Sequence, residues 1–226
     1  FLLLQHGDLD AALAPCERAL AIREKVLGPD AASVGECLID LGALLEQLGK
    51  FDEAQRHLER AVAIAERVYG PDRVETAVCL YSLSYLLIEQ REFEKAQPLC
   101  ERALAIKERV LGPDDVSTGR SLGDLGLLLT TKGELEKARP LFERELRIVE
   151  TALGPDAVDV GHALNNLGGL LCQQRNYEKA QPLLERSLAI YQRALATQNP
   201  DLALVLYNLA NVLHGRGRLA EARPLY

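Results

Sequence analysis

The sequence contains no methionine among its 226 residues, so we expect the natural N-terminus of the protein to lie outside this chain. It also lacks any uninterrupted apolar run close to the roughly 20 residues that a membrane-spanning helix needs. The runs that occur, such as Leu127–Leu129, are only a few residues long. The absence of a long run predicts that a membrane is not a partner.

Clustered positive charge is missing as well. The formal net charge is −7, with 26 Lys and Arg against 33 Asp and Glu. The basic residues alternate with glutamates, as in Glu59-Arg60, Glu143-Arg144 and Glu185-Arg186, which is typical of a solvated helix face. Because nucleic-acid-binding proteins concentrate Lys and Arg in a patch, we expect no nucleic-acid partner.

Cysteine pairs with metal-ligand spacing are absent too. The five cysteines are Cys16, Cys37, Cys79, Cys100 and Cys172, and none forms a C-x-x-C pair. Their number is odd, and four of them lie in two repeat columns whose other members include Leu, Phe, Ser and Ala. This placement predicts small buried thiols rather than a disulfide framework or a zinc site. Free thiols favour a reducing compartment, and we expect a cytoplasmic location.

What the sequence has in abundance is repetition. The turn Gly-Pro-Asp begins at Gly28, Gly70, Gly112 and Gly154, with a spacing of 42 residues each time. At the fifth position Ala196-Thr197-Gln198 replaces the turn, yet the leucine column continues in steps of 42 through Leu41, Leu83, Leu125, Leu167 and Leu209. An alanine column follows the same period: Ala12, Ala54, Ala96, Ala138, Ala180 and Ala222. Such a period indicates a repeat architecture.

Each period contains two amphipathic helices. In the first complete period the apolar residues Leu38, Leu41, Leu45 and Leu48 share one stripe of a helix over 33–48, and a second helix follows over 52–69. The same reasoning predicts helices at 9–27, 75–90, 94–111, 117–132, 136–153, 159–174, 178–195, 201–215 and 219–226. Small residues at Gly42, Gly126, Gly168 and Ala210 are expected to lie opposite the alanine column, so that paired helices approach closely.

The pattern Leu38-x-x-Leu41-Gly42-x-x-Leu45, followed by Ala54, Leu58 and Ala61, resembles the tetratricopeptide repeat (TPR) signature. The 42-residue period and the Leu-Gly-Pro-Asp turn resemble its longer variant, found in kinesin light chains and nephrocystin-like proteins. The resemblance implies an all-α fold, a right-handed α–α solenoid of TPR helix hairpins. It implies a single array with a partial repeat at 1–28, repeats at about 32–70, 74–112, 116–154 and 158–196, and a partial repeat at 200–226.

Both ends of the sequence cut through a repeat. Residues 1–6 match the last third of a first helix, and Leu225-Tyr226 fall inside a second helix. We therefore expect this chain to be a fragment of a longer array. Natural solenoids end in polar capping repeats, so self-association through exposed repeat ends is a further expectation.

Searches for catalytic motifs return nothing. The sequence has no P-loop, no G-x-S-x-G and no H-E-x-x-H, which predicts neither an enzyme nor a cofactor. Gly215-Arg216-Gly217-Arg218 superficially resembles a glycine-rich loop, but it occupies the turn between the two helices of a repeat. Cys172 and His214 share a repeat position without nearby carboxylates, a poor basis for a metal site.

In TPR arrays the first helix of each repeat lines a concave groove that holds extended peptides. On that resemblance three columns line the groove here: Glu36, Val78, Arg120, His162 and Leu204; then Ile39-Asp40, Tyr81-Ser82, Gly123-Asp124, Asn165-Asn166 and Tyr207-Asn208; then Ala43, Tyr85, Leu127, Gly169 and Asn211. The expected peptide-binding residues are Tyr81, Tyr85, Arg120, His162, Asn165, Asn166, Tyr207, Asn208 and Asn211.

The asparagines resemble those that hold a ligand's backbone in relatives, because an amide offers both a donor and an acceptor. The alternative is that they bond neighbouring helices, and the tyrosines equally could pack within the groove wall. Asp40 and Asp124 stand where relatives have Asn, so the N-terminal half of the groove is expected to repel acidic peptides. Arg120 and His162 could still receive one carboxylate.

Two functions fit these observations. The first is a protein-interaction scaffold that binds an extended peptide or a partner helix in the concave groove. The second is a sensor or oligomerisation arm of a larger signalling ATPase or a similar multidomain protein. The array would then dock on its own chain.

Overall fold

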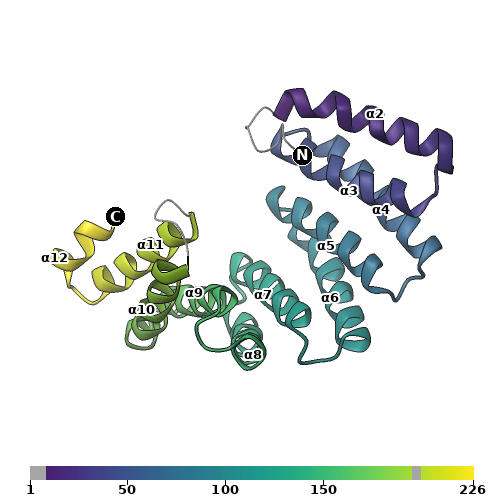
Figure 1. Cartoon of the computed structure of the whole chain (residues 1–226). Helices are drawn as coiled ribbons and strands as arrows, with labels where there is room; N and C mark the ends of the chain where they lie inside the picture. Colours follow the sequence, from purple (N-terminus) through teal and green to yellow (C-terminus); the bar gives the residue numbers. More distant parts are fainter. Residues whose placement is uncertain (1–8, 195–199) are drawn as a thin grey trace. The chain divides into compact units, whose positions relative to one another are not determined.

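A computed structural model describes residues 9–194 and 200–226 (Figure 1). The described residues fall into two compact units, the first extending to Val110 and the second beginning at Leu111. Within the described ranges all regular structure is helical and no strand occurs. The expectations for residues 1–6 and for Ala196-Thr197-Gln198 lie outside the described residues.

The first unit contains α2 (Leu9–Leu27), α3 (Ala32–Gln47), α4 (Phe51–Val68), α5 (Val74–Glu89) and α6 (Phe93–Val110). The second contains α7 (Val116–Thr131), α8 (Leu135–Leu153), α9 (Val158–Gln173), α10 (Tyr177–Ala194), α11 (Pro200–Gly215), α12 (Leu219–Ala222) and a 3₁₀ turn (Arg223–Leu225). The predicted helices are confirmed to within one residue at each described end, apart from the last. That helix begins at Leu219 as predicted but ends at Ala222, four residues early, and a 3₁₀ turn follows over Arg223–Leu225. Tightening of the last turn to 3₁₀ geometry is common at helix termini.

Within each unit the helices form two layers. The first helix of a repeat packs on the second, so α3 pairs with α4, α5 with α6, α7 with α8 and α9 with α10. First helices also contact each other along the array, α3 with α5, α7 with α9 and α9 with α11. Among the described helices no comparable contact joins consecutive second helices, so the first helices crowd together on one side of each unit.

Arginines on the second helices tie successive repeats together. Arg60 donates to the carbonyl of Pro29 at 2.7 Å, and its guanidinium lies 2.6 Å from Glu24 of the preceding second helix. Arg102 and Arg186 repeat the arrangement one and three periods later. The Glu-Arg alternation therefore provides surface ion pairs between repeats, each anchored on a Gly-Pro-Asp turn. Exposed pairs of this kind contribute up to about 1 kcal/mol each.

The nearest side chain to the small-residue column is a large apolar residue of the second helix. A Cβ added at Gly42 would meet Leu58 at 2.8 Å, and one added at Gly168 would meet Leu184 at 2.7 Å. These glycines therefore admit the large apolar residue that stands one turn after the alanine. Ala54, Ala96, Ala138 and Ala180 are themselves fully buried.

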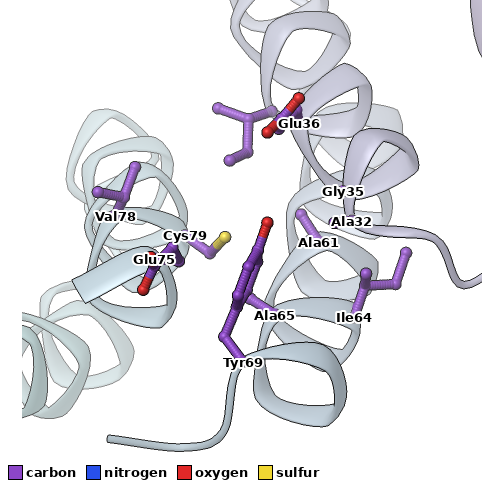
Figure 2. A pocket seen from close by; sticks show the side chains of 11 residues that line it. Ala32, Gly35, Glu36, Ala61, Ile64, Ala65, Tyr69, Glu75, Val78 and Cys79 are labelled. Atoms are coloured by element: carbon purple, nitrogen blue, oxygen red, sulfur yellow. The ribbon is translucent and has the colours of Figure 1, made fainter. Parts of the chain in front are cut away.

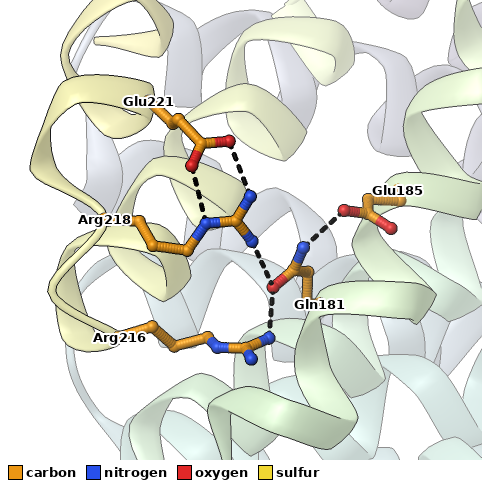
Figure 3. A network of polar contacts seen from close by, with 5 residues as sticks. All are labelled: Gln181, Glu185, Arg216, Arg218 and Glu221. Carbon is orange, nitrogen blue, oxygen red and sulfur yellow. Dashed lines mark hydrogen bonds and ion pairs between the residues drawn. The ribbon is translucent and has the colours of Figure 1, made fainter.

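The turn at Gly215-Arg216-Gly217-Arg218 connects α11 to α12, as predicted. Gly217 has a φ of +76°, in the left-handed region that glycine adopts at low cost. Figure 3 shows both arginines of this turn engaged by protein acceptors. Arg216 donates to Oε1 of Gln181 at 2.5 Å, and Arg218 forms a two-bonded pair with Glu221 at 2.6 and 2.7 Å.

All five cysteines are free thiols, with Cys37, Cys79 and Cys100 buried and Cys16 and Cys172 half-buried. Burial raises the pKa of Cys79 to about 11, so its reactive thiolate is scarce at neutral pH. We expect Cys16 to be alkylated first in the native protein and Cys79 far more slowly. Alkylation under denaturing, non-reducing conditions followed by mass measurement should show five labels, and a count of three would reveal a disulfide.

Candidate functional site

The large apolar side chains that stay exposed on the first helices fall in the predicted groove columns. They are Val78 and Tyr85 on α5, Leu127 on α7, and Leu204 and Tyr207 on α11, each between 45% and 54% exposed. We call the predicted groove columns on α3 and α5, and those on α7, α9 and α11, the first-helix face of the unit that contains them. Its exposed apolar residues are of the kind that partner proteins cover.

In the first unit, Tyr81 and Tyr85 lie together on this face. Their ring centroids are 6.4 Å apart, and the Lys107 ammonium lies 5.9 Å from the Tyr81 centroid. Burial raises the pKa of Tyr85, with Glu89 and Glu46 adding to the shift. The two rings form one wall of a groove of about 380 Å³ between α3 and α5, whose opposite side includes Ile39, Ala43 and Glu46.

A second hollow of the first unit lies between α3, α4 and α5 and measures about 170 Å³ (Figure 2). Its walls are mainly apolar, with Ala32 and Gly35 from α3 and Ala61, Ile64 and Ala65 from α4. Tyr69 reaches into it from the end of α4, as Figure 2 shows. Glu36, Glu75, Ile39, Val78 and Cys79 complete the lining.

In the second unit, the two predicted groove residues Arg120 and His162 face carboxylates of the same chain. Nε of Arg120 on α7 lies 2.6 Å from Oδ1 of Asp159 on α9. This hydrogen bond lowers the pKa of Asp159 and raises that of Arg120. Nε2 of His162 lies 3.9 Å from Asp201, and its ring packs edge-on against Tyr191 at 5.3 Å.

The predicted asparagines are bonded to neighbouring side chains. Nδ2 of Asn208 on α11 donates to Oδ1 of Asn165 on α9 at 2.9 Å, and Asn165 is only 6% exposed. Asn211 accepts from the hydroxyl of Tyr226 at 2.9 Å, and the Tyr226 ring lies edge-on to Tyr207 at 6.0 Å. These contacts match the alternative in which the amides join adjacent helices, while a role in ligand binding stays a prediction.

One residue of this region was missed by the sequence reasoning. Glu145 on α8 is 5% exposed, and its Oε2 has no hydrogen-bond partner among the described residues. Burial raises the pKa of its carboxyl to about 8, although a hydrogen bond from Asn166 acts in the opposite direction. The carboxyl lies where a Cβ at Gly123 would stand, directly beneath the first-helix face.

A signal for Glu145 is present in the sequence. The corresponding position of other repeats holds Ala61, Ala103 and Ser187, so a glutamate interrupts a column of small residues. The facing position, Gly123, is the smallest in its own column. A large residue opposite a glycine therefore indicated that this side chain is turned inward.

Within residues 9–194 and 200–226, no three His, Cys, Asp or Glu side chains are grouped so that they could hold a metal ion. None of the helices in these ranges is both long and apolar enough to span a membrane.

The tetratricopeptide repeat family model matches residues 1–67, 41–97, 82–151 and 159–226. The chain belongs to the tetratricopeptide repeat family. Repeats of this family generally serve protein–protein interaction, and the predicted all-α solenoid of TPR hairpins is confirmed.

Solved structures show the same fold at low sequence identity. BtubC (BKLC) from P. vanneervenii is 21% identical, with a TM-score of 0.80 over 96% of this chain and 87% of that one. A Podosopora anserina protein with nearly identical kinesin-light-chain TPR-like repeats is 22% identical, with a TM-score of 0.73 over 86% and 92%. The apo form of RapI is 19% identical, with a TM-score of 0.71 over 96% of this chain and 57% of that one. No curated protein matches the chain significantly.

Proposed function

We propose that this TPR chain is a protein-interaction scaffold that binds an extended peptide or a partner helix along its first-helix face. The observation that carries the proposal is the exposure of Val78, Tyr85, Leu127, Leu204 and Tyr207 in the groove columns of otherwise well-buried helices. A partner that covers them gains the free energy of apolar burial, at roughly 25 cal/mol per Å² of apolar surface.

Tyr207 is the strongest anchor in the second unit under this proposal. Its side chain is 54% exposed, and it stands beside Asn208 and within ring contact of Tyr226. Large aromatic residues dominate binding energy at interfaces because they bury much area with few rotatable bonds. Arg120 and His162 add less for an acidic ligand, since Asp159 and Asp201 already face them.

The first test maps the bound surface directly. The chain would be used to capture partners from an extract of its source cells, and amide hydrogen exchange would then be compared with and without the purified partner. We expect added protection in the first helices α5, α7, α9 and α11. Protection confined to the second helices α4, α6, α8 and α10 would show that the opposite side is the one used.

A matched pair of substitutions gives a quantitative prediction. Leu204→Ala removes an exposed leucine of the first-helix face, and Leu153→Ala removes one at the end of α8 that is similarly exposed, at 44% against 51%. We expect Leu204→Ala to weaken partner binding by about 1–2 kcal/mol, as at an interface anchor. Leu153→Ala should change it by less than about 0.5 kcal/mol. Titration calorimetry of both variants measures how much binding free energy each one loses. Equal losses would contradict the proposal.

The captured partner would also address the other function that the sequence allows. A sensor arm that docks on its own chain should recover little from the extract, whereas an oligomerisation arm should recover a second copy of this protein. Either outcome would count against a scaffold for other proteins.

A further inference from the structure

We propose that the hollow between α3, α4 and α5 is a side-chain pocket for a basic peptide. It would take an apolar side chain of an extended segment of a partner protein that carries Lys or Arg next to that residue. The inference rests on the proposed function and adds to it the chemical class of ligand and the place where that ligand is anchored.

The size and lining of the pocket determine which side chain of the peptide can be held in it. The space of about 170 Å³ exists because α3 and α4 present Gly35, Ala61 and Ala65 to it. An apolar cavity of about 150 Å³ is large enough for a benzene-sized molecule. A leucine or phenylalanine side chain therefore matches the volume of this hollow, beside the Tyr69 ring, and Val78 in its lining is 45% exposed.

The charge around the pocket opening determines which peptide residues are favoured next to the apolar side chain that the pocket holds. Glu36 and Glu75 both line the pocket and are exposed, and neither has an ion-pair partner among the described residues. The helices that carry them, α3 and α5, hold the acidic residues Glu36, Asp40, Glu46, Glu75 and Glu89 and no Lys, Arg or His. Lys107 reaches this face from α6, but it is 9% exposed and lies over Tyr81.

The same place in the second unit has larger wall residues and an ion pair. Two periods further on, Arg120 and Asp159 replace Glu36 and Glu75, and their ion pair bridges α7 and α9. Two wall positions are also larger there, because Glu145 and Val149 replace Ala61 and Ala65 and both are buried. The first unit therefore differs from the second in both volume and charge, and both differences favour an apolar anchor with basic neighbours.

A selection from displayed random peptides of about 12 residues tests the inference with the whole chain as bait. We expect enrichment of peptides with Leu, Ile or Phe next to Lys or Arg, and depletion of Asp and Glu. A selected peptide, made synthetically and labelled, should bind more weakly as ionic strength rises from about 0.05 to about 0.5 M, because salt screens exposed charges.

Two substitutions copied from the second unit should close the pocket. Glu36→Arg places an arginine opposite Glu75, as Arg120 faces Asp159 in the second unit. Ala65→Val adds volume to the pocket wall and so narrows the pocket. We expect each to weaken binding of the selected peptide by about tenfold or more. Because the same residues stand in the folded second unit, circular dichroism should show intact helices. Glu59→Arg makes the same charge change on an exposed residue of α4 and should leave binding within about twofold.

The outcomes separate this inference from the broader one. Acidic peptides, or basic peptides unaffected by Glu36→Arg, would overturn the pocket assignment while the first-helix face could still bind the captured partner. A selection without binders would overturn it too. If Glu36→Arg instead abolished a concentration-dependent dimer in sedimentation and no peptide bound, the occupant would be a second copy and the inference would be wrong.

Discussion

Replacing Glu145 with glutamine is expected to stabilise the second unit by a few kcal/mol near pH 8, and by almost nothing near pH 4. The carboxyl has a pKa of about 8 in the folded protein, against an ordinary value of 4.5. Between these values the folded state keeps a proton that the unfolded state releases, so stability falls as pH rises. Each pH unit in this window costs up to about 1.4 kcal/mol.

The direction of the effect follows from burial. The stability that the neutral carboxyl contributes is fully present below the unfolded pKa and is lost as the pH passes through the folded pKa. Glutamine has the same shape and never ionises, and it keeps an acceptor for the hydrogen bond from Asn166. The variant therefore does not lose stability as the pH rises. The difference in free energy of unfolding between the variant and the natural protein should grow steadily from about pH 5 to about pH 8.

Urea denaturation of both proteins at several pH values measures the effect, with far-ultraviolet circular dichroism as the signal that reports unfolding. Glu143→Gln on the same helix is the control, since Glu143 is exposed and its ion pair with Arg139 is on the surface. Losing such a pair costs about 0.5 kcal/mol or less, at all pH values in this range. A constant difference between Glu145→Gln and the natural protein from pH 5 to pH 8 would show that the carboxyl is not kept neutral by folding.

The repeat architecture was predictable from sequence because its determinants are local and periodic. A Gly-Pro-Asp turn every 42 residues and a leucine stripe within each helix define where helices begin, end and face the core. That is why the helix bounds agree to within a residue, and why Ala54 and Leu58 are buried as expected. The one helix whose end differs, at 219–226, gives way to a 3₁₀ turn after Ala222, a change of hydrogen bonding that the apolar pattern does not report.

The partners of the groove residues were not predictable in the same way. The Arg120–Asp159 pair and the Asn208–Asn165 bond join residues 39 and 43 positions apart. Such contacts depend on which rotamers neighbouring first helices allow, and a single repeat does not contain that information. That Leu58 is the nearest side chain to Gly42 was unpredictable for a similar reason, because the sequence period fixes spacing along the chain and not the point where two helices cross.

The close contact between the glycine column and the second helix predicts a large loss of stability when a glycine is replaced. A Cβ at Gly126 would lie 2.6, 2.9 and 3.0 Å from ring atoms of Phe142, which is fully buried. A rigid ring at full packing density has little room to move, so Gly126→Ser should destabilise the second unit by about 1–3 kcal/mol. The first unit already has serine at this repeat position. Ser84 is buried, its hydroxyl donates to the Tyr81 carbonyl at 2.7 Å, and the position matching Phe142 there is the smaller Cys100.

Copying that pair into the second unit tests the explanation. Phe142→Cys alone leaves a cavity and should cost about 3–5 kcal/mol, as for the loss of other buried aromatic rings. In the double variant the serine occupies space that the ring has vacated, so the combined loss should fall short of the sum by about 0.5–3 kcal/mol. Urea denaturation of the four proteins gives this coupling energy. Strict additivity would mean that Gly126 and Phe142 do not compete for the same space, and glycine would then be needed there for its backbone alone. Because Gly126 lies inside α7, where backbone freedom only costs stability, we expect the coupling to be found.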